Sequence, residues 1–490
     1  MNAAAYLLAT GQDSAIALEC GTERLNYGEL RAAAAHAAGA WRARGLGQGE
    51  RVLVFAPDSI DWAIAYLGAI WAGGVAVGLN SRLFERELSI VLSESGARFI
   101  WCNESSRALL ERLLVDVADP PRLVIDAEWS EHLASAAAVP AAELPDDAPA
   151  MWIYTSGTTG VPKAVMHAQR SFIASADFAR EILGLSAQDR IYASSKMFFA
   201  YALGNSLCAG LRLGATVVLD PEWPTAERVA EVIERHRPTA LFSVPTLYLK
   251  MLQAGVAARL RAAGVRHYGS AGEALPAAVR REWREATGAA PVSGYGASET
   301  VALMFYCDDD SALLKPCPRL EYRMRDGNTA GAPRRLWLRH PSVALGYWQR
   351  PEAERDSFAD GWFSPGDLFR QRADGGLEFC GRDDDMLKIS GQWVSILDVE
   401  QALLGASAGC VEGLAAIGFD NTEGLASIAL FVVAARGHET QARERLDAGI
   451  AALPKLKRPR LVTWVSELPL TATGKLQRRK LKDLYLGGAA

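Results

Sequence analysis

Several features that would place this chain in other classes of protein are missing from its 490 residues. Its 52 Lys and Arg residues are outnumbered by 57 Asp and Glu residues, so the broad basic surface of a nucleic-acid-binding protein is absent. The seven cysteines are scattered without a C-x-x-C pair, which argues against a disulfide framework or a zinc site. The N-terminus lacks the charged start and apolar stretch of a signal peptide. We therefore predict a cytoplasmic protein with core cysteines and no nucleic acid among its partners.

A long apolar run that would indicate a membrane protein is also lacking. The uncharged segment 62–79 approaches the length that spans a bilayer, but it is rich in Ala, and Gly73 and Gly74 interrupt it. We interpret it as a buried helix over 59–71 followed by a buried strand over 75–77, with a membrane span as the alternative. No membrane is expected as a partner.

What the chain does have is the composition of a globular protein with a large core. Half of its residues are hydrophobic and 22% are charged. The length predicts about two to four domains. Strand-like runs over 51–55, 98–101, 123–125, 215–219, 240–244 and 265–269 alternate with helical patterns over 27–44, 225–235 and 277–287. This alternation predicts layered α/β structure with largely parallel sheets.

The later part of the chain changes character twice. Segment 308–336 is polar and not periodic, which predicts loops and short strands. A charged turn over 382–385 then leads into mixed strands and helices, and we place the domain boundary there. The N-terminal domain is expected to span 1–383 and the C-terminal domain 384–490.

The strongest chemical signal is Thr155-Ser-Gly-Thr-Thr-Gly-Val-Pro-Lys163, a polar loop between two strand-like runs. Its glycines let backbone N–H groups approach a phosphate, its hydroxyls add donors, and its lysine adds a positive charge. A surface loop rich in turn formers is the alternative. The spacing is not that of a Walker A loop, so kinase-like machinery is not expected.

Four weaker segments carry further candidate residues. Gly294–Thr300 offers an aromatic face in Tyr295 and a carboxylate in Glu299, which suits Mg²⁺. Asp367 follows Gly366 and is placed either to accept ribose hydroxyls or to form an ordinary Asx turn. The segment from Gly381 to Gly391 lies at the proposed boundary. Lys475 follows Thr-Gly near the C-terminus, where a simple surface charge is the alternative.

In this order, the five segments resemble the adenylate-forming superfamily of acyl-CoA synthetases, carrier-protein adenylation domains and luciferases. The resemblance runs from Leu25-Asn-Tyr-Gly-Glu-Leu30 to Lys475, and the Thr155–Lys163 loop is its most specific part. Three segments, 196–205, 270–276 and 390–394, resemble the benzoate-CoA ligase branch more narrowly. The implied fold is a large N-terminal domain of layered α/β subdomains with a small β subdomain, followed by a small mobile α+β domain.

The resemblance implies a reaction in two halves. A carboxylate attacks the α-phosphorus of ATP and releases pyrophosphate, and a thiol then attacks the acyl-adenylate and releases AMP. The cofactors implied are ATP, Mg²⁺ and coenzyme A, or the phosphopantetheine of a carrier protein. A small aromatic carboxylic acid is the implied substrate, and the protein is expected to be a monomer or a homodimer.

The resemblance also assigns roles to residues. Those assigned to the nucleotide are Thr155, Ser156, Gly157, Thr158, Thr159, Gly160, Lys163, Gly272, Glu273, Ala274, Tyr295, Gly296, Ser298, Asp367, Arg382 and Gly391. The catalytic set is Lys475, Glu299 (also the Mg²⁺ ligand), Lys388 and the hinge residue Asp384, and the acyl pocket is assigned Phe199, Ala200, Tyr201, Gly294, Ala302 and Leu303. Ala302 is small where benzoate-specific members have a bulky residue, which favours a ring with a meta or para substituent.

Pro365 replaces the family's usual Thr or Ser, and 308–336 is shorter than is typical, whereas the candidate catalytic residues are retained. An aryl-CoA ligase is the leading hypothesis, and a ligase that loads a carrier protein is the closest alternative. The basic residues over 455–482 suit both the 3′-phosphate of CoA and an acidic carrier surface. A luciferase-like oxidoreductase and a non-enzymatic nucleotide-binding module are the alternatives of other classes.

Overall fold

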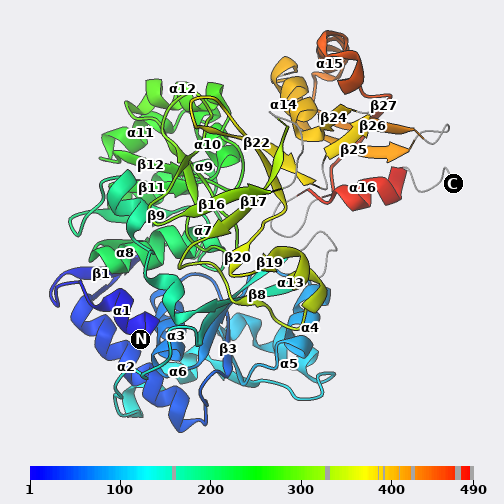
Figure 1. Ribbon diagram of the computed structural model, residues 1–490. Helices are drawn as coiled ribbons and strands as arrows, with labels where there is room; N and C mark the ends of the chain where they lie inside the picture. The colour runs from blue at the N-terminus through cyan, green and yellow to red at the C-terminus, as the bar shows by residue number, and fades with distance from the viewer. Residues whose placement is uncertain are drawn as a thin grey trace. The chain divides into compact units, whose positions relative to one another are not determined.

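The computed structural model describes residues 1–156, 162–325, 332–383, 386–389, 392–407, 409–420, 425–469 and 476–485 (Figure 1). These residues form two compact units. The first contains 1–155, 162–322 and 338–363, and the second contains the described residues of 156–161, 323–337 and 364–490. The predicted domain boundary between 383 and 384 stays a prediction.

Two large sheets organise the first unit. Within the described chain, nine strands form one sheet in the order β15 (Lys315–Pro316), β14 (Phe305–Cys307), β13 (Val292–Tyr295), β12 (His267–Ser270), β11 (Ala240–Ser243), β9 (Arg190–Ala193), β10 (Thr216–Leu219), β1 (Ile16–Cys20), β2 (Glu23–Asn26). Seven described strands form the other in the order β18 (Gly346–Tyr347), β8 (Pro162–Ala168), β7 (Pro149–Ser156), β4 (Val75–Gly78), β3 (Arg51–Phe55), β5 (Phe99–Cys102), β6 (Arg122–Ile125). Most neighbouring strands pair in parallel, which confirms the predicted class.

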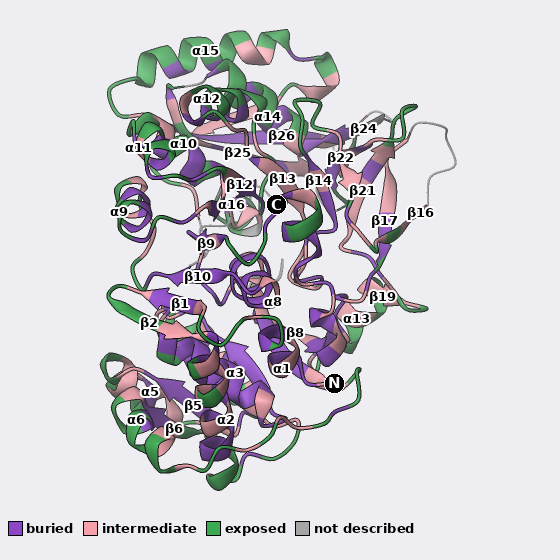
Figure 2. Cartoon of the chain, turned by 90° about the vertical axis from the view of Figure 1, so that its left-hand side faces the viewer, coloured by how far each residue is buried: buried purple, intermediate pink, exposed green. Residues whose placement is uncertain are grey.

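Alternating apolar residues explain why both faces of these sheets are covered. In β3, Val52 and Val54 contribute to one core, whereas Leu53 and Phe55 contribute to another. The first core also contains residues of the nine-stranded sheet, so a single apolar layer serves both sheets. Figure 2 shows strands such as β5 and β10 almost entirely buried.

Helices supply the rest of each core. Those of the shared layer are α1 (Ala3–Leu8), α2 (Tyr27–Ala43), α3 (Ile60–Trp71), α6 (Asp126–Ser135) and α8 (Ala209–Leu213). The other face of the seven-stranded sheet packs on α4 (Glu85–Glu94) and α5 (Arg107–Leu114). The other face of the nine-stranded sheet packs on α9 (Ala226–His236), α10 (Pro245–Gln253), α11 (Ala257–Ala262) and α12 (Ala277–Thr287).

The apolar segment 62–79 belongs to this buried layer. Ser59 caps α3 by accepting the N–H of Trp62 at 3.0 Å, and Gly73 turns the chain with a φ of +92° before β4. The predicted buried helix and strand are confirmed. No helix in the described part of the chain is long and apolar enough to cross a membrane. The seven cysteines are free thiols, and all but the half-buried Cys20 are buried.

The first unit also contains the short hairpin of β19 (Phe358–Ala359) and β20 (Trp362–Phe363), preceded by α13 (Pro351–Ser357). In the second unit, β21 (Asp367–Gln371) and β22 (Leu377–Arg382) form a hairpin that pairs with the start of β17 (Arg334–Arg339), a neighbour of β16 (Glu321–Arg325). Segment 308–336 thus contains short strands, as predicted, within its described residues.

The rest of the second unit is an α+β arrangement. Its strands are the hairpin β23 (Met386–Ile389) and β24 (Gln392–Ser395), and the sheet β25 (Val411–Asp420), β26 (Ala426–Ala434), β27 (Leu461–Trp464). One face of that sheet packs on α14 (Ile396–Ala406) and α15 (Glu439–Ala452), and the other on α16 (Arg478–Tyr485). Arg478 and Glu400 join α16 to α14 through an ion pair of 2.5 Å.

Candidate active site

The candidate residues of the first unit gather around the carboxyl ends of parallel strands. β9, β11, β12 and β13 run parallel side by side, so the chain leaves all four at one edge of the sheet. Segments 196–201, 271–276 and 296–303 follow three of these strands directly or closely. In open α/β sheets this edge is where ligands bind. The fold therefore places the predicted acyl and nucleotide residues of the first unit at a suitable location.

A tight turn after β13 presents Ser298 and Glu299. Thr300 is fully buried, and its hydroxyl accepts the N–H of Ala297 at 3.0 Å and contacts the carbonyl of Ala302 at 2.9 Å. The N–H of Thr300 donates to the carbonyl of Ala297 at 3.1 Å. These bonds satisfy the backbone of the turn internally and fix the direction of the two residues between Ala297 and Thr300.

Two neighbouring segments hold the turn from outside. His167 on β8 donates from Nε2 to the carbonyl of Ser298 at 2.8 Å, and the N–H of Ala344 donates to the carbonyl of Glu299 at 2.8 Å. Tyr347 on β18 donates its hydroxyl to Glu299 Oε1 at 2.7 Å. The candidate Mg²⁺ ligand is thus fixed through both its backbone and its side chain.

Lys163 lies on β8 close to this turn. Its Nζ is 4.8 Å from the ring centroid of Tyr347, in the arrangement of a cation over an aromatic face. Tyr347 is the register neighbour of Val165. The structure therefore brings together the lysine that ends the predicted phosphate loop and the predicted metal-binding glutamate. Thr155 ends β7 with Ser156, whereas Gly157, Thr158, Thr159 and Gly160 lie outside the described residues.

The donor set around Glu299 fits Mg²⁺ that is bound jointly with phosphates. No group of three His, Cys, Asp or Glu side chains suited to a metal occurs in the described part of the chain. A single carboxylate beside a lysine matches the coordination preference of Mg²⁺, which binds one or two carboxylates together with phosphate oxygens. Glu299 is half-buried rather than enclosed in the core.

The adenine candidates and several acyl candidates lie at the end of β13 or in the loops that follow β12 and β13. Tyr295 ends β13, and its ring centroid is 6.0 Å from that of Phe305. A Cβ on Gly294 would lie 2.4 Å from Cδ1 of Leu303, so Leu303 occupies space that only a glycine leaves open. Ala302 is half-buried beside it. Gly272, Glu273 and Ala274 lie exposed in the loop after β12, and Gly296 is exposed after β13.

Segment 196–201, which carries three acyl-pocket candidates, is anchored by buried polar groups. Asp58 accepts the N–H of Met197 at 3.2 Å, and Lys196 donates to the carbonyl of Asp220 at 2.6 Å. Burial raises the pKa of Asp58 to about 7 and lowers the pKa of Lys196. Phe199 and Ala200 are half-buried. The hydroxyl of Tyr201 is buried and has no hydrogen-bond partner among the described residues.

The remaining candidates belong to the second unit. Asp367 and Arg382 are register partners on β21 and β22, and Nε of Arg382 is 3.6 Å from Oδ1 of Asp367. Arg382 also donates to the carbonyl of Pro365 at 3.0 Å, so the replaced residue still positions the arginine through its backbone. Lys388 is exposed on β23. Asp384, Gly391 and Lys475 lie outside the described residues.

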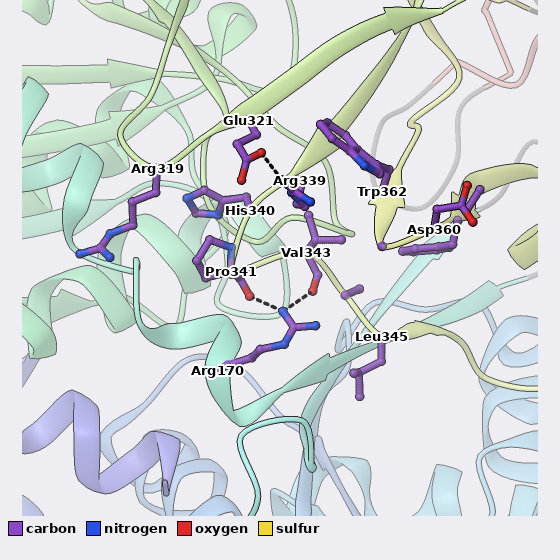
Figure 3. Close-up of a pocket in the computed structure, with 14 residues that line it drawn as sticks. Arg170, Arg319, Glu321, Arg339, His340, Pro341, Val343, Leu345, Asp360 and Trp362 are labelled. Atoms are coloured by element: carbon purple, nitrogen blue, oxygen red, sulfur yellow. Dashed lines mark hydrogen bonds and ion pairs between the residues drawn. The ribbon is translucent and has the colours of Figure 1, made fainter.

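A cavity of about 660 Å³ in the first unit is lined by residues outside the predicted set (Figure 3). Arg170, Arg319 and Arg339 line it together with His340 and Trp362, and none of the predicted site residues does. Each of the three arginines is neutralised by a carboxylate, from Asp147, Asp177 and Glu321 respectively. The cavity therefore has no excess positive charge that would favour an anionic ligand, and the strand edge remains the candidate site.

His167 and Tyr347 are functional candidates that the sequence patterns did not single out. His167 lies four residues beyond Lys163 on β8 and therefore on the same face, since side chains alternate along a strand. A histidine on the same face of the predicted strand as the phosphate-loop lysine was the sequence pattern that could have identified it. For Tyr347, 48 residues after Glu299, no local pattern gives the contact.

We expect His167 to make the stability of the protein depend on pH. Burial lowers its pKa to about 4 from 6.5, so the unfolded chain binds the extra proton between these values and stability falls as the pH falls. This single residue should cost about 2 kcal/mol of unfolding free energy between pH 7.5 and pH 5. His167→Gln keeps a hydrogen-bond donor near Ser298 but does not titrate. In urea unfolding, the variant should therefore lose less unfolding free energy than wild type between pH 7.5 and pH 5, by the same amount. Equal losses in wild type and variant would contradict the assignment, and His438→Gln, at an exposed position, is the matched control.

Comparisons with known proteins identify the family that the chain resembles over most of its length. Residues 8–348 match the model of the family described as "AMP-binding enzyme". The chain is 39% identical to a 3-hydroxybenzoate–CoA ligase of Aromatoleum sp. (strain CIB), over 98% of this chain and 95% of that protein. It is 37% identical to a 3-hydroxybenzoate–CoA/4-hydroxybenzoate–CoA ligase of Thauera aromatica, over 97% and 95%. The crystal structure of the anthranilate CoA ligase AuaEII with anthranoyl-AMP superimposes with a TM-score of 0.90 at 28% identity, covering 100% of this chain and 98% of that one.

Proposed function

The chain belongs to the family of AMP-binding enzymes, and from this premise we propose that it activates an aromatic carboxylic acid with ATP and transfers the acyl group to coenzyme A. The observation that carries the proposal is the placement of Lys163, Tyr347 and Glu299 beside the strand edge. A cation and a metal-binding carboxylate at one place suit a triphosphate. The names of the relatives, which are ligases of hydroxybenzoates and anthranilate, support the aromatic acid.

The first half-reaction brings two anions together, and the chain's charged groups serve that task. The segment Thr155–Lys163 would hold the β- and γ-phosphates, with Glu299 holding Mg²⁺. When bound, Mg²⁺ neutralises charge on the phosphates. Tyr295 would stack on adenine, and Asp367 with Arg382 would hold the ribose. Lys475 would bridge the carboxylate and the α-phosphate.

The second half-reaction needs room for a thiol near the acyl-adenylate. We propose that the C-terminal domain, 384–490, turns about Asp384, so that Lys475 leaves and the segment around Lys388 takes its place. Such closure about a few backbone torsions is a common device in enzymes. The basic residues over 455–482 would meet a phosphate of CoA.

The acid substrate proposed is a benzoate with a hydroxyl or amino substituent at the meta or para position. The hydroxyl of Tyr201 is buried without a partner among the described residues, and an unpaired buried hydroxyl costs free energy that a ligand recovers by bonding to it. Phe242 packs against the edge of the Tyr201 ring at 6.1 Å and helps fix its direction. A polar ring substituent would supply the missing partner.

Replacing Tyr201 by Phe tests this choice of acid. We expect the ratio of kcat/KM for the preferred hydroxybenzoate to that for benzoate to fall by about fivefold, the worth of one hydrogen bond of about 1 kcal/mol. Tyr248→Phe is the matched control, because its buried hydroxyl donates to the carbonyl of Gly269 at 2.9 Å instead. A wild-type enzyme that prefers unsubstituted benzoate to every substituted analogue would refute the substrate proposal.

The proposed activity itself is tested by acid-dependent ATP–pyrophosphate exchange without any thiol. The panel contains hydroxybenzoates, aminobenzoates, cinnamates and fatty acids. Exchange with the substituted benzoates is expected, and exchange with fatty acids alone would overturn the aromatic substrate. Adding CoA, or separately a carrier protein with its phosphopantetheine arm, then identifies the acceptor, and thioester formation only with the carrier would overturn CoA.

A further inference from the structure

We propose that Tyr347 is a positioning residue of the nucleotide site, holding the Glu299 carboxylate for the metal and the Lys163 ammonium for the phosphates. The proposal rests on the proposed function and adds to it a residue outside the sequence motifs. Tyr347 contacts both groups at once, through its hydroxyl at 2.7 Å from Glu299 Oε1 and through its ring at 4.8 Å from Lys163 Nζ.

The surroundings of Tyr347 make its ring a fixed platform. Its side chain is buried, with 4% of the residue exposed. It pairs with Val165 on β8 through the backbone, and the ring of Phe358 packs edge-on at 5.5 Å. Because Lys163 lies on the same strand as Val165, the pairing of β18 with β8 sets the distance between the ring and the ammonium.

Tyr347 contacts both the Lys163 ammonium and the Glu299 carboxylate, and, among the described residues, these two groups do not pair with each other directly. No ion pair joins Lys163 to Glu299 within the described part of the chain, although both contact one side chain. A direct pair would occupy the carboxylate and the ammonium that the triphosphate and its metal need. The hydroxyl bond to a carboxylate is charge-assisted, and the ring face attracts the ammonium, so each group has a weaker neutral partner until the ligand binds.

Other residues hold the backbone of the turn, so the role of Tyr347 is to position the Glu299 side chain. His167 and Ala344 already fix the carbonyls of Ser298 and Glu299. The carboxylate itself has Tyr347 as its hydrogen-bond partner among the described residues. Removing the hydroxyl would therefore free the Glu299 side chain to change rotamer while the turn stays in place.

Tyr347→Phe separates positioning from packing, because it keeps the ring and removes only the hydroxyl. We expect the Mg²⁺ concentration for half-maximal pyrophosphate exchange to rise about tenfold, as for the loss of one charge-assisted hydrogen bond. The KM for the acid and the thermal midpoint should stay near the wild-type values. Calorimetry of ATP binding provides the readout that does not depend on turnover: affinity with Mg²⁺ should fall, and affinity without Mg²⁺ should not.

The matched control is Tyr6→Phe. Tyr6 also has a cation over its ring, Arg212 at 4.1 Å, and donates its hydroxyl to the carbonyl of Ile173 at 3.1 Å. Tyr347→Leu removes the ring as well and should also weaken ATP binding without Mg²⁺. In a Glu299→Gln background, Tyr347→Phe should not change the Mg²⁺ dependence further. This double-mutant cycle isolates the interaction between Tyr347 and Glu299.

A wild-type Mg²⁺ dependence in folded Tyr347→Phe would overturn the proposal, as would equal effects in Tyr6→Phe and Tyr347→Phe. Failure of the proposed function looks different: wild type would then show no exchange with any acid. In that event the calorimetric comparison with and without Mg²⁺ still decides the role of Tyr347. Absence of any ATP binding by wild type would overturn both.

Discussion

Lys475→Ala is expected to remove adenylation while leaving thioester formation from premade acyl-adenylate nearly intact. Pyrophosphate exchange should fall by about 10²–10³, the typical loss when one preorganised charged donor is taken from a transition state. The second half-reaction should continue because, in the proposed mechanism, Lys475 has already left the site. Single-turnover formation of the thioester from synthetic acyl-adenylate and CoA measures that half by itself.

The physical reason is the charge of the first transition state. A carboxylate approaches an α-phosphate that is itself anionic, so a cation that touches both lowers the barrier more than it stabilises either reactant alone. In the proposed site, Lys163 and Glu299 would serve the outer phosphates, Glu299 by holding Mg²⁺, and neither residue would replace this cation. The loss should therefore appear in kcat and only weakly in the affinity for ATP.

Lys482→Ala is the matched control, since Lys482 is an exposed lysine of α16 in the same basic segment. It should leave both half-reactions unchanged or raise only the KM for CoA. Equal losses of both half-reactions in Lys475→Ala would contradict the assigned role and would instead indicate a general disturbance of the C-terminal domain.

The elements of the fold follow closely from sequence because local patterns determine them. The run over 51–55 alternates between two cores, as its buried β3 requires, and Ser59 and Gly73 mark the two ends of a helix that is apolar on nearly every side. Asn26 and Glu29 form a capping box at the start of α2. In each case the deciding interaction lies within a few residues along the chain.

The site was only partly predictable, because its support comes from pairing between distant strands. The Thr155–Lys163 loop and Glu299 are visible as residue types with suitable neighbours in sequence. The contact of Tyr347 with Glu299 depends on β18 pairing with β8, and that register is a tertiary result. Asp58, which anchors Met197 from 139 residues away, belongs to the same class of contact. Sequence patterns identify residues that would contact the ligand more readily than the residues that hold those residues in position.

The described residues before and after Asp384 belong to two separate hairpins, β21–β22 and β23–β24. On one side, the N–H of Asp383 donates to the carbonyl of Gly366 at 2.8 Å, and Arg382 is register partner to Asp367 in β22 and β21. On the other side, β23 begins at Met386, which pairs with Ser395. In sequence, Asp384 therefore lies between two hydrogen-bonded hairpins. In the proposed mechanism the rotation of the C-terminal domain is concentrated between these hairpins and would leave both intact.

Asp384→Pro should consequently keep adenylation and lose thioester formation. The proline ring fixes φ near −65° and also restricts Asp383 before it, so the torsions that differ between the two proposed arrangements are no longer free. Pyrophosphate exchange should remain within a few-fold of wild type, whereas single-turnover thioester formation should fall by about 10² or more, the scale of loss when reacting groups are misplaced. Asp384→Ala, which preserves torsional freedom, should support both half-reactions and serves as the control. An Asp384→Pro enzyme with an intact second half-reaction would contradict the hinge, because the domain would then have to turn about torsions that proline leaves untouched.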